Sequence, residues 1–258
     1  MQTTTTNAVR YDVREDVAFL TLDAPPVNVL SGAMMDELAT GIARAQADRS
    51  LKALVFESAT RAFSAGADVG EHRPEEAAAM IAAFSRLFAA FGTVELPVVM
   101  AVDGAALGAG FELVMMADIL LATDRSTFGQ PEIRLGFFAP VGVAWLSERI
   151  GLARAIEVTS TGRTYTAAEM QAMGLVSRVV GDAGLPAALE QVLGDLRRAS
   201  PLVMRMNVRL SRQLYGRSFE DARLEAERVF LGELMATEDV REGIASFFEK
   251  RRPAWKNR

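Results

Sequence analysis

The pattern of apolar and polar positions predicts strands and helices in alternation over the first half of the chain. Residues 1–10 are polar and Thr-rich and are expected to form a loose arm. Val17–Leu22 and Lys52–Glu57 have the apolar alternation that is typical of strands. Between them, apolar residues at helical spacing follow Ser31, whose hydroxyl can cap the first turn of a helix. The chain is therefore expected to open as strand, edge strand, helix, strand.

A second unit of the same kind follows. Apolar residues at helical spacing predict a helix over residues 75–91, and Leu96–Val102 is a candidate for a short buried strand. A glycine-rich turn at Gly104–Gly110 then leads into a helix at Phe111–Ala117 and a strand at Asp118–Ala122. Alternation of strands and helices on this scale predicts an α/β fold whose sheet is covered by helices.

Strand signals fade after about Ala144, and the last third of the chain is predicted to be helical. The expected helices span residues 145–150, 153–160, 167–173, 185–199, 201–215 and 219–234. We therefore expect a mixed core over residues 1–195 and a helical C-terminal region over residues 196–258.

Composition restricts the kinds of protein that this chain can be. It has 258 residues, of which 50% are hydrophobic, and 28 Lys and Arg against 33 Asp and Glu give a formal net charge of −5. These values are typical of a globular protein with one large core, and the acidic balance argues against a nucleic-acid binder. The N-terminus lacks a basic segment followed by an apolar one, and no apolar run approaches the roughly 20 residues that cross a bilayer. We therefore expect no membrane association and a cytoplasmic location.

The chain contains no cysteine and one histidine, His72. The absence of cysteine excludes disulfides, thiolate zinc sites and a cysteine nucleophile. A single imidazole disfavours a Ser-His-Asp triad and a multi-histidine metal site. Acid–base chemistry is therefore expected to fall to carboxylates, without a metal ion.

Three segments combine small residues with a carboxylate: Phe63–Asp68, Gly104–Leu113 and Phe128–Glu132. The first two follow expected strands and precede expected helices, so backbone N–H groups at the start of each helix can point at an anion. Two such groups aimed at one oxygen form an oxyanion hole. The pattern therefore predicts stabilisation of negative charge on a ligand oxygen.

Spacing alone leaves other interpretations of these segments open. The glycine turn lacks the lysine of a phosphate-binding loop, and Leu113 stands where the dinucleotide fingerprint needs a third glycine. A tight turn with only a structural role is an alternative. Glu112 could simply interact with the dipole of its helix, and Glu132 could be a solvated loop residue.

Together and in this order, the segments resemble the enoyl-CoA hydratase/isomerase family, the crotonase superfamily. The similarity covers the chain from Val17–Leu22 to the closing Phe247–Arg251, and Ala117–Ile119 and Phe128–Ile133 add to it. The resemblance implies an α/β crotonase-like spiral of ββα turns with a helical C-terminal region that builds homotrimers, commonly paired into homohexamers. It also implies a coenzyme A thioester as the substrate and no separate cofactor, because coenzyme A enters as part of the substrate.

The resemblance assigns roles to individual residues. In the family, two backbone N–H groups hold the thioester oxygen, and they map onto Ala67 and Ala109, the second of which is commonly glycine. Family hydratases use two glutamates, which map onto Glu112 and Glu132. Glu132 is expected to give a proton to carbon while Glu112 orients and activates water. Coenzyme A contacts are implied at Ala65, Asp68, Phe247 and Lys250.

The residues after Glu132 depart from the commonest family pattern. Phe137–Val141 replaces a glycine-rich run, and Phe137 and Phe138 are expected to line the acyl pocket, unless they merely fill the core. This stretch and Ser64–Glu76 are similar to cyclohexa-1,5-diene-1-carbonyl-CoA hydratases of aromatic degradation. The expected function is therefore addition of water to a conjugated acyl-CoA, with a cyclic dienoyl-CoA as one candidate. An enoyl-CoA isomerase or an acyl-CoA hydrolase on the same scaffold is the alternative.

Two further features have competing interpretations. His72 follows the first segment and is either a residue of a loop at the pocket mouth or a participant in catalysis. The cations of residues 250–258 form either a solvated tail or part of a coenzyme A site. A non-catalytic, RNA-binding member of the fold would use the same tail, but the net charge of −5 argues against it.

Overall fold

A six-stranded sheet forms the centre of the computed structural model, which describes residues 7–258. Its strands lie in the order β1-β2-β4-β6-β8-β11. β1 pairs with β2 in antiparallel orientation, and the other neighbouring pairs are parallel. The strands span Val9–Arg14 (β1), Val17–Leu22 (β2), Ala53–Ser58 (β4), Val98–Val102 (β6), Ile119–Thr123 (β8) and Arg178–Val180 (β11).

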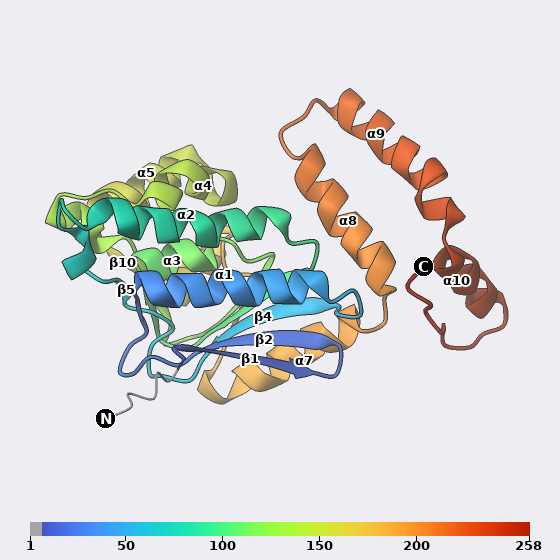
Figure 1. Cartoon of the computed structure of the whole chain (residues 1–258), viewed down its shortest axis with the longest axis horizontal. Coiled ribbons are helices and arrows are strands. Elements are labelled where there is room, and N and C mark those ends of the chain that lie inside the picture. Colours follow the sequence, from blue (N-terminus) through green and yellow to red (C-terminus); the bar gives the residue numbers. More distant parts are fainter. Residues whose placement is uncertain (1–6) are drawn as a thin grey trace.

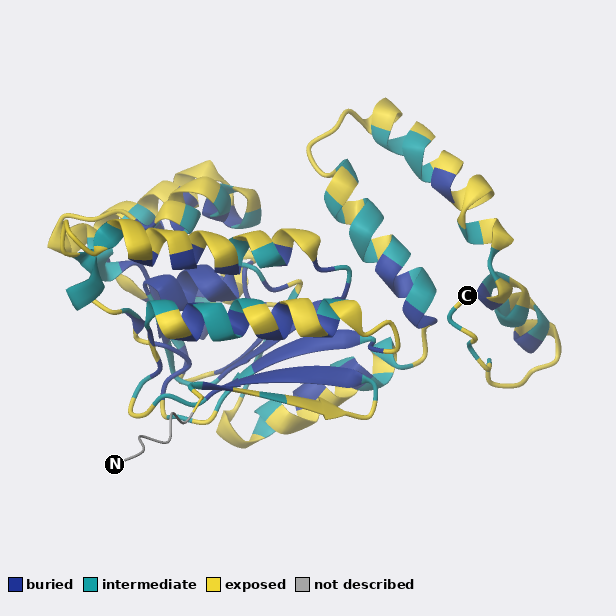
Figure 2. Cartoon of the chain, in the orientation of Figure 1, coloured by how far each residue is buried: buried dark blue, intermediate teal, exposed yellow. Residues whose placement is uncertain are grey.

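Side chains alternate between the two faces of this sheet and enter two separate cores. In β4, Phe56 packs into the larger core, whereas Val55 packs into the smaller one. α1 (Gly32–Ala47) and α2 (Ala77–Thr93) cover the larger core, and α7 (Leu185–Leu196) covers the other face (Figure 1). Figure 2 shows buried strands beneath helices whose outer surfaces are exposed. The expected α/β architecture is confirmed.

Two small sheets extend this core. β7 (Ala105–Leu107), β9 (Thr127–Gly129) and β10 (Thr164–Thr166) form one of them, and β3 (Val29–Leu30) pairs with β5 (Gly66–Ala67) in the other. β7 lies inside the segment that the sequence predicts to be a glycine turn. That prediction is incomplete, because the first part of the segment pairs with β9 and only the residues after it form the turn into the next helix.

The remaining helices lie mainly in the second half of the chain. They span Ala109–Val114 (α3), Pro140–Ile150 (α4), Leu152–Thr161 (α5), Ala167–Met173 (α6), Pro201–Leu214 (α8), Phe219–Gly232 (α9) and Glu238–Phe248 (α10). Short 3-10 turns cover Gly70–His72 (η1), Pro131–Leu135 (η2), Asp182–Gly184 (η3) and Leu234–Ala236 (η4). Among residues 7–258, no helix has both the length and the apolar composition that crossing a membrane requires.

α8, α9 and α10 extend away from the sheet and form an arm (Figure 1). Arg205, buried on α8, ties the arm to the end of α1 by donating to the backbone oxygens of Gln46 (3.2 Å) and Asp48 (2.5 Å). Much of the apolar surface of the arm is exposed, including Phe219, Leu231, Phe247 and Phe248. The boundary predicted between residues 195 and 196 falls at the last turn of α7. The division into a core and an oligomerisation region stays a prediction.

The sequence pattern misses elements that are short or polar. β1 begins at Val9, within residues expected to be a loose arm, and residues 1–6 of that arm lie outside the described residues. The expectation of helices alone after Ala144 is wrong, because β10 and β11 lie there, and α10 is also missed. β10 and β11 have three residues each, which is too short for an apolar alternation to show.

Candidate active site

An apolar cavity of about 340 Å³ opens between α2, η1, η2 and the first turns of α3 and α4. Among the described residues that line it, the ionisable side chains are those of His72, Glu112 and Glu132. The wall formed by α2 consists of Ala77, Met80, Ile81 and Phe84. A cavity of this size with a few convergent polar groups is typical of a small-molecule site.

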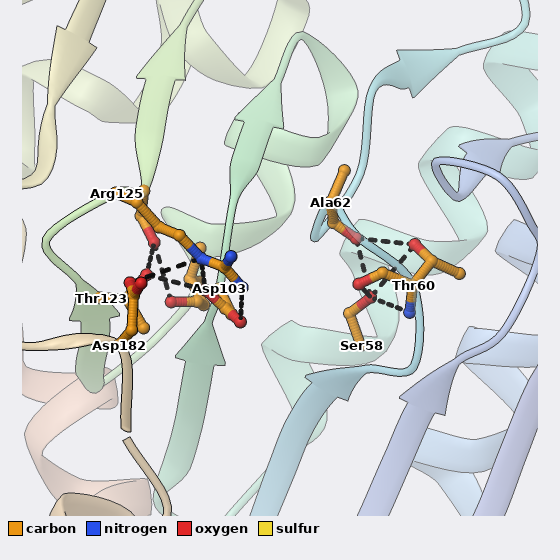
Figure 3. A network of polar contacts seen from close by, with 9 residues as sticks. Ser58, Thr60, Ala62, Asp103, Thr123, Arg125 and Asp182 are labelled. Atoms are coloured by element: carbon orange, nitrogen blue, oxygen red, sulfur yellow. Dashed lines mark hydrogen bonds and ion pairs between the residues drawn. The ribbon is translucent and has the colours of Figure 1, made fainter. Parts of the chain in front are cut away.

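Two polar networks fix the turns that lead into the cavity (Figure 3). After β4, the Ser58 hydroxyl accepts a hydrogen bond from the Thr60 N–H at 3.0 Å. After β6, the Asp103 carboxylate accepts one from the Thr123 hydroxyl at 2.8 Å. The first turn leads to Phe63–Asp68 and the second leads to β7. The polar side chains at these strand ends therefore set the direction in which both candidate segments leave the sheet.

Phe63–Asp68 lies directly against β7. Ser64 and Ala106 form an isolated parallel bridge, in which the Ser64 carbonyl accepts from the Leu107 N–H at 3.0 Å. The Ser64 N–H in turn donates to the Ala105 carbonyl at 3.0 Å. This strand-like pairing brings together two segments that lie about 40 residues apart in the sequence.

Ala67 and Ala109, predicted to be the two halves of an oxyanion hole, both line the cavity. A Cβ placed on the neighbouring Gly66 would stand 3.7 Å from the Ala109 nitrogen, so the two segments are adjacent here. Ala109 is the first residue of α3, and its N–H therefore has no partner within the helix. The structure brings the two predicted residues together.

Gly108 occupies a position that strongly favours glycine. Its backbone has φ 54° and ψ −128°, a region from which a Cβ normally excludes other residues. A Cβ there would also stand 2.5 Å from Glu132 Oε1, well inside van der Waals contact. The glycine therefore allows the Glu132 carboxylate to approach the backbone of the turn.

Glu112 lies on α3 and is almost fully buried, with 2% of its surface exposed. Its Oε1 accepts hydrogen bonds from the backbone N–H groups of Val141 (2.7 Å) and Gly142 (2.9 Å) at the start of α4. Burial, and to a smaller extent the charge of Glu132, raise the pKa of Glu112 to about 8, against the opposing effect of the two N–H groups. Glu112 is therefore a carboxyl that can hold a proton at neutral pH.

Glu132 lies in the first turn of η2, next to Pro131, and is half-buried. Burial raises its pKa, while a backbone N–H and the charge of His72 lower it. With its amide nitrogen turned toward Glu132, Gln130 donates to both carboxylate oxygens, at 2.9 and 3.2 Å. Gln130 is itself buried, so this contact fixes the carboxylate. It belongs to the motif that contains Glu132, but the sequence alone gave it no role.

Phe137 and Phe138 line the outer side of the cavity. With 37% and 68% of their surface exposed, they do not fill the core, which removes that alternative. Ala65 also lines the cavity. The Asp68 carboxylate instead turns back to its own loop and accepts from the Gly70 N–H at 2.7 Å.

Phe247 and Lys250 lie at the end of α10 and just after it, in the arm, and they do not line the cavity. Within one chain, the structure does not bring them to the other predicted residues. Part of the basic tail is neutralised locally, since Arg251 Nη2 donates to Glu242 Oε2 at 3.0 Å. The predicted contact of Phe247 and Lys250 with coenzyme A stays a prediction.

The described residues offer no obvious metal site. Within residues 7–258, no three His, Cys, Asp or Glu side chains gather in a way that could hold a metal ion.

Known proteins resemble this chain over nearly its whole length. Residues 12–258 match the family model for enoyl-CoA hydratase/isomerase. A probable enoyl-CoA hydratase of Mycobacterium bovis is 36% identical over 251 residues, which cover 94% of this chain and 95% of the relative. The cyclohexa-1,5-dienecarbonyl-CoA hydratase of Thauera aromatica is 32% identical over 239 residues, 93% of this chain and 92% of that protein. The crystal structure of an enoyl-CoA hydratase of Mycobacterium smegmatis has a TM-score of 0.90 at 30% identity and covers 96% of this chain and 98% of its own.

Proposed function

The chain belongs to the enoyl-CoA hydratase/isomerase family, and from that membership we propose that it is a hydratase, which adds water to the conjugated double bond of an acyl-CoA thioester. One observation carries the proposal: Glu112 and Glu132 line a single apolar cavity together with Ala67 and Ala109. The names of relatives that are 36% identical to this chain, probable enoyl-CoA hydratases, support it.

The N–H groups of Ala67 and Ala109 are proposed to receive the thioester oxygen. When the oxygen of water bonds to the β-carbon, the electron pair of the double bond moves toward the thioester, whose oxygen becomes an enolate. Donors that are already in place stabilise this charge, and loss of one such donor typically costs about 10²–10³ in rate. Coenzyme A arrives as part of the substrate, and the proposed step uses no further cofactor.

The glutamate pair is proposed to move the protons. Burial raises the pKa of both carboxyls, that of Glu112 to about 8, and we propose that the pair shares one proton at neutral pH. In the reactive arrangement this proton sits on Glu132, and the N–H groups of Val141 and Gly142 stabilise Glu112 as the carboxylate. Glu112 takes a proton from water while the water oxygen bonds to carbon, and Glu132 gives its proton to the α-carbon. The pair ends with one proton, as it began.

The cavity walls favour an apolar acyl group. Phe84, Phe137 and Phe138 give the cavity aromatic surfaces on two sides, and these surfaces suit a ring as well as a chain. The similarity to the Thauera aromatica hydratase supports a cyclic dienoyl-CoA as one candidate substrate. We therefore propose cyclohexa-1,5-diene-1-carbonyl-CoA and crotonyl-CoA as the two compounds to compare.

The arm is proposed to associate with further copies of the chain in a homotrimer or homohexamer. Phe219 and Phe247 on the arm are 81% and 77% exposed, and such apolar surface is typical of an interface. In such an assembly, Phe247 and Lys250 of one copy would contact the coenzyme A of another. Light scattering of the purified protein tests this proposal, and a mass of one chain at micromolar concentration would contradict it.

Mass spectrometry of the products tests the reaction. The purified protein is incubated separately with the two thioesters, and hydration gives a product heavier by one water. Glu112→Gln and Glu132→Gln are each expected to lower kcat by about 10²–10⁴, because each removes a proton-transfer group, with little change in KM. Conversion without a change of mass would indicate an isomerase instead, and release of free coenzyme A would indicate a hydrolase.

A further inference from the structure

Along α2, the cavity ends at Phe84. Ala77, Met80, Ile81 and Phe84 lie on one face of this helix, and among the described residues of α2 they are the ones that line the cavity. Ile81 is 41% exposed, whereas Met80 and Phe84 are each 6% exposed. Phe84 is therefore a buried side chain in the last turn of α2 that the cavity reaches.

A row of aromatic rings supports Phe84 from behind. The ring centre of Phe88, one turn further along α2, is 4.4 Å from that of Phe84. The Phe91 ring follows at 6.2 Å from Phe88 and stacks on Phe56 of β4 at 5.5 Å. Phe56 and Phe91 both belong to the larger core. Because the interior of a protein is closely packed, the Phe84 ring cannot move back easily to make room.

A second ring contact joins two walls on the outer side of the cavity. The Phe137 ring packs against the ring of His72 on η1, with the two ring centres 5.0 Å apart and the planes inclined by 48°. The preceding residue, Glu71, anchors η1 to the start of α1 by accepting from the Gly32 N–H at 3.1 Å. The cavity is therefore bounded by ring contacts on its outer side and at its end along α2.

We propose that Phe84 is the specificity-determining residue that limits the length of the acyl group: its ring closes the inner end of the cavity, so the substrates are thioesters of compact acyl groups, short chains or a single ring. The proposal rests on the proposed hydratase function, which places the thioester at Ala67 and Ala109 and the acyl group in the rest of the cavity. The cavity volume of about 340 Å³ lies near the lower end of the roughly 300–1,000 Å³ that is typical of ligand pockets, in agreement with a compact group.

A fixed end wall has a defined effect on affinity. Each CH₂ group that an acyl chain buries in an apolar cavity increases affinity by about fourfold. Once the chain reaches Phe84, further CH₂ groups are no longer buried, because Phe88 supports the ring. Affinity should therefore rise with chain length and then stop rising.

Binding of saturated acyl-CoA thioesters measures this limit without any reaction. Butyryl-, hexanoyl-, octanoyl-, decanoyl- and dodecanoyl-CoA have no double bond to hydrate, and isothermal titration calorimetry gives the Kd of each. In the wild type, affinity should stop rising within this series. A continuous rise up to dodecanoyl-CoA would overturn the proposal and leave the proposed function intact. If no thioester binds, the proposed function is wrong, and this proposal is wrong with it.

Phe84→Ala removes the phenyl ring and leaves Phe88 as the next side chain along α2. The limit should move to longer chains, and dodecanoyl-CoA should bind about tenfold or more tightly than to the wild type, which corresponds to about two additional buried CH₂ groups. Phe84→Leu should move the limit in the same direction by less, and it provides the test if the alanine variant fails to fold. An unchanged limit in the folded variant would overturn the proposal.

Phe91→Ala is the matched control. It removes a ring of the same size from the same row, and Phe91 is 3% exposed but is not among the described residues that line the cavity. We expect a lower melting temperature, as in Phe84→Ala, and the same length limit as in the wild type. If Phe91→Ala moves the limit as far as Phe84→Ala does, loosening of the core explains the change and the proposal is wrong.

Discussion

Replacement of Gly108 by alanine should abolish most of the activity without unfolding the protein. The new Cβ would stand 2.5 Å from Glu132 Oε1, whereas an ordinary contact needs about 3.4 Å, so the carboxylate must move by about 1 Å. A displacement of that size in a reacting group typically costs about 10² in rate. The backbone of Gly108, at φ 54° and ψ −128°, adds about 1–3 kcal/mol of strain when it carries a side chain.

Gly151→Ala separates these two effects. Gly151 has φ 83° and ψ 150°, so alanine is strained there as well, but a Cβ at this position would meet no atom within 4 Å. Both variants should therefore melt a few degrees lower than the wild type, because 1 kcal/mol corresponds to about 2–4 °C in a protein of this size. Only Gly108→Ala should lose about 10² in kcat.

Circular dichroism melting and steady-state hydration of crotonyl-CoA measure the two quantities. A displacement of 1 Å is expected to cost roughly 10² in rate, so a folded Gly108→Ala variant that retains kcat within about threefold of the wild type would contradict this prediction. An equal loss of activity in Gly151→Ala would contradict it too, since strain alone would then explain both.

Three further changes have defined outcomes. The pKa of Glu112 is raised from 4.5 to about 8. The free energy of unfolding of the wild type should therefore fall relative to that of Glu112→Gln as pH rises from 5 to 8, by an amount on the order of a few kcal/mol, and urea titrations measure this difference. Asn28→Ala removes a fully buried amide that accepts from the Ala24 N–H (2.7 Å) and donates to the Ser58 hydroxyl (2.8 Å). The melting temperature of this variant should fall by roughly 5–15 °C, and a drop of less than about 2 °C would show that these hydrogen bonds do not stabilise the fold. Phe138→Ala should keep its free energy of unfolding within about 0.5 kcal/mol of the wild type, because the side chain is 68% exposed. The ratio of kcat/KM for the cyclic and linear thioesters should nevertheless change by about tenfold, and competition assays measure this ratio directly.

Elements with a long, regular apolar pattern are predictable from this sequence. Val17–Leu22 and Ala167–Met173 have the bounds that the pattern gives, and Ser31 caps its helix by accepting from the Met34 N–H at 3.3 Å. β1 is missed because it carries charged residues between its apolar ones and lies at the edge of the sheet. Its position depends on pairing with β2, which an isolated segment does not reveal.

The residues of the candidate site are likewise predictable from the sequence only in part. Glu112 and Glu132 can be selected from the sequence because the segments that contain them, taken together, resemble those of the enoyl-CoA hydratase/isomerase family, whereas spacing alone leaves their roles open. The contact of Gln130 with Glu132, and that of Glu112 with the Gly142 N–H, depend on how η2 and α4 fold back toward α3. No local pattern encodes the ring contact of His72, because its partner lies 65 positions away on another loop.

The outer wall of the cavity is built from surface residues, whereas its chemical side, which carries Gly108 and Glu112, is buried. Leu135 and Phe138 are 60% and 68% exposed, while Glu112 is 2% exposed and a Cβ on Gly108 would stand 2.5 Å from Glu132 Oε1. A mutation in the outer wall therefore costs little folding free energy, and one on the chemical side costs either folding or activity. A lineage that carries this fold can change the acyl group it accepts by single surface substitutions and retain the same reaction, so new substrates are more accessible to its evolution than new chemistry.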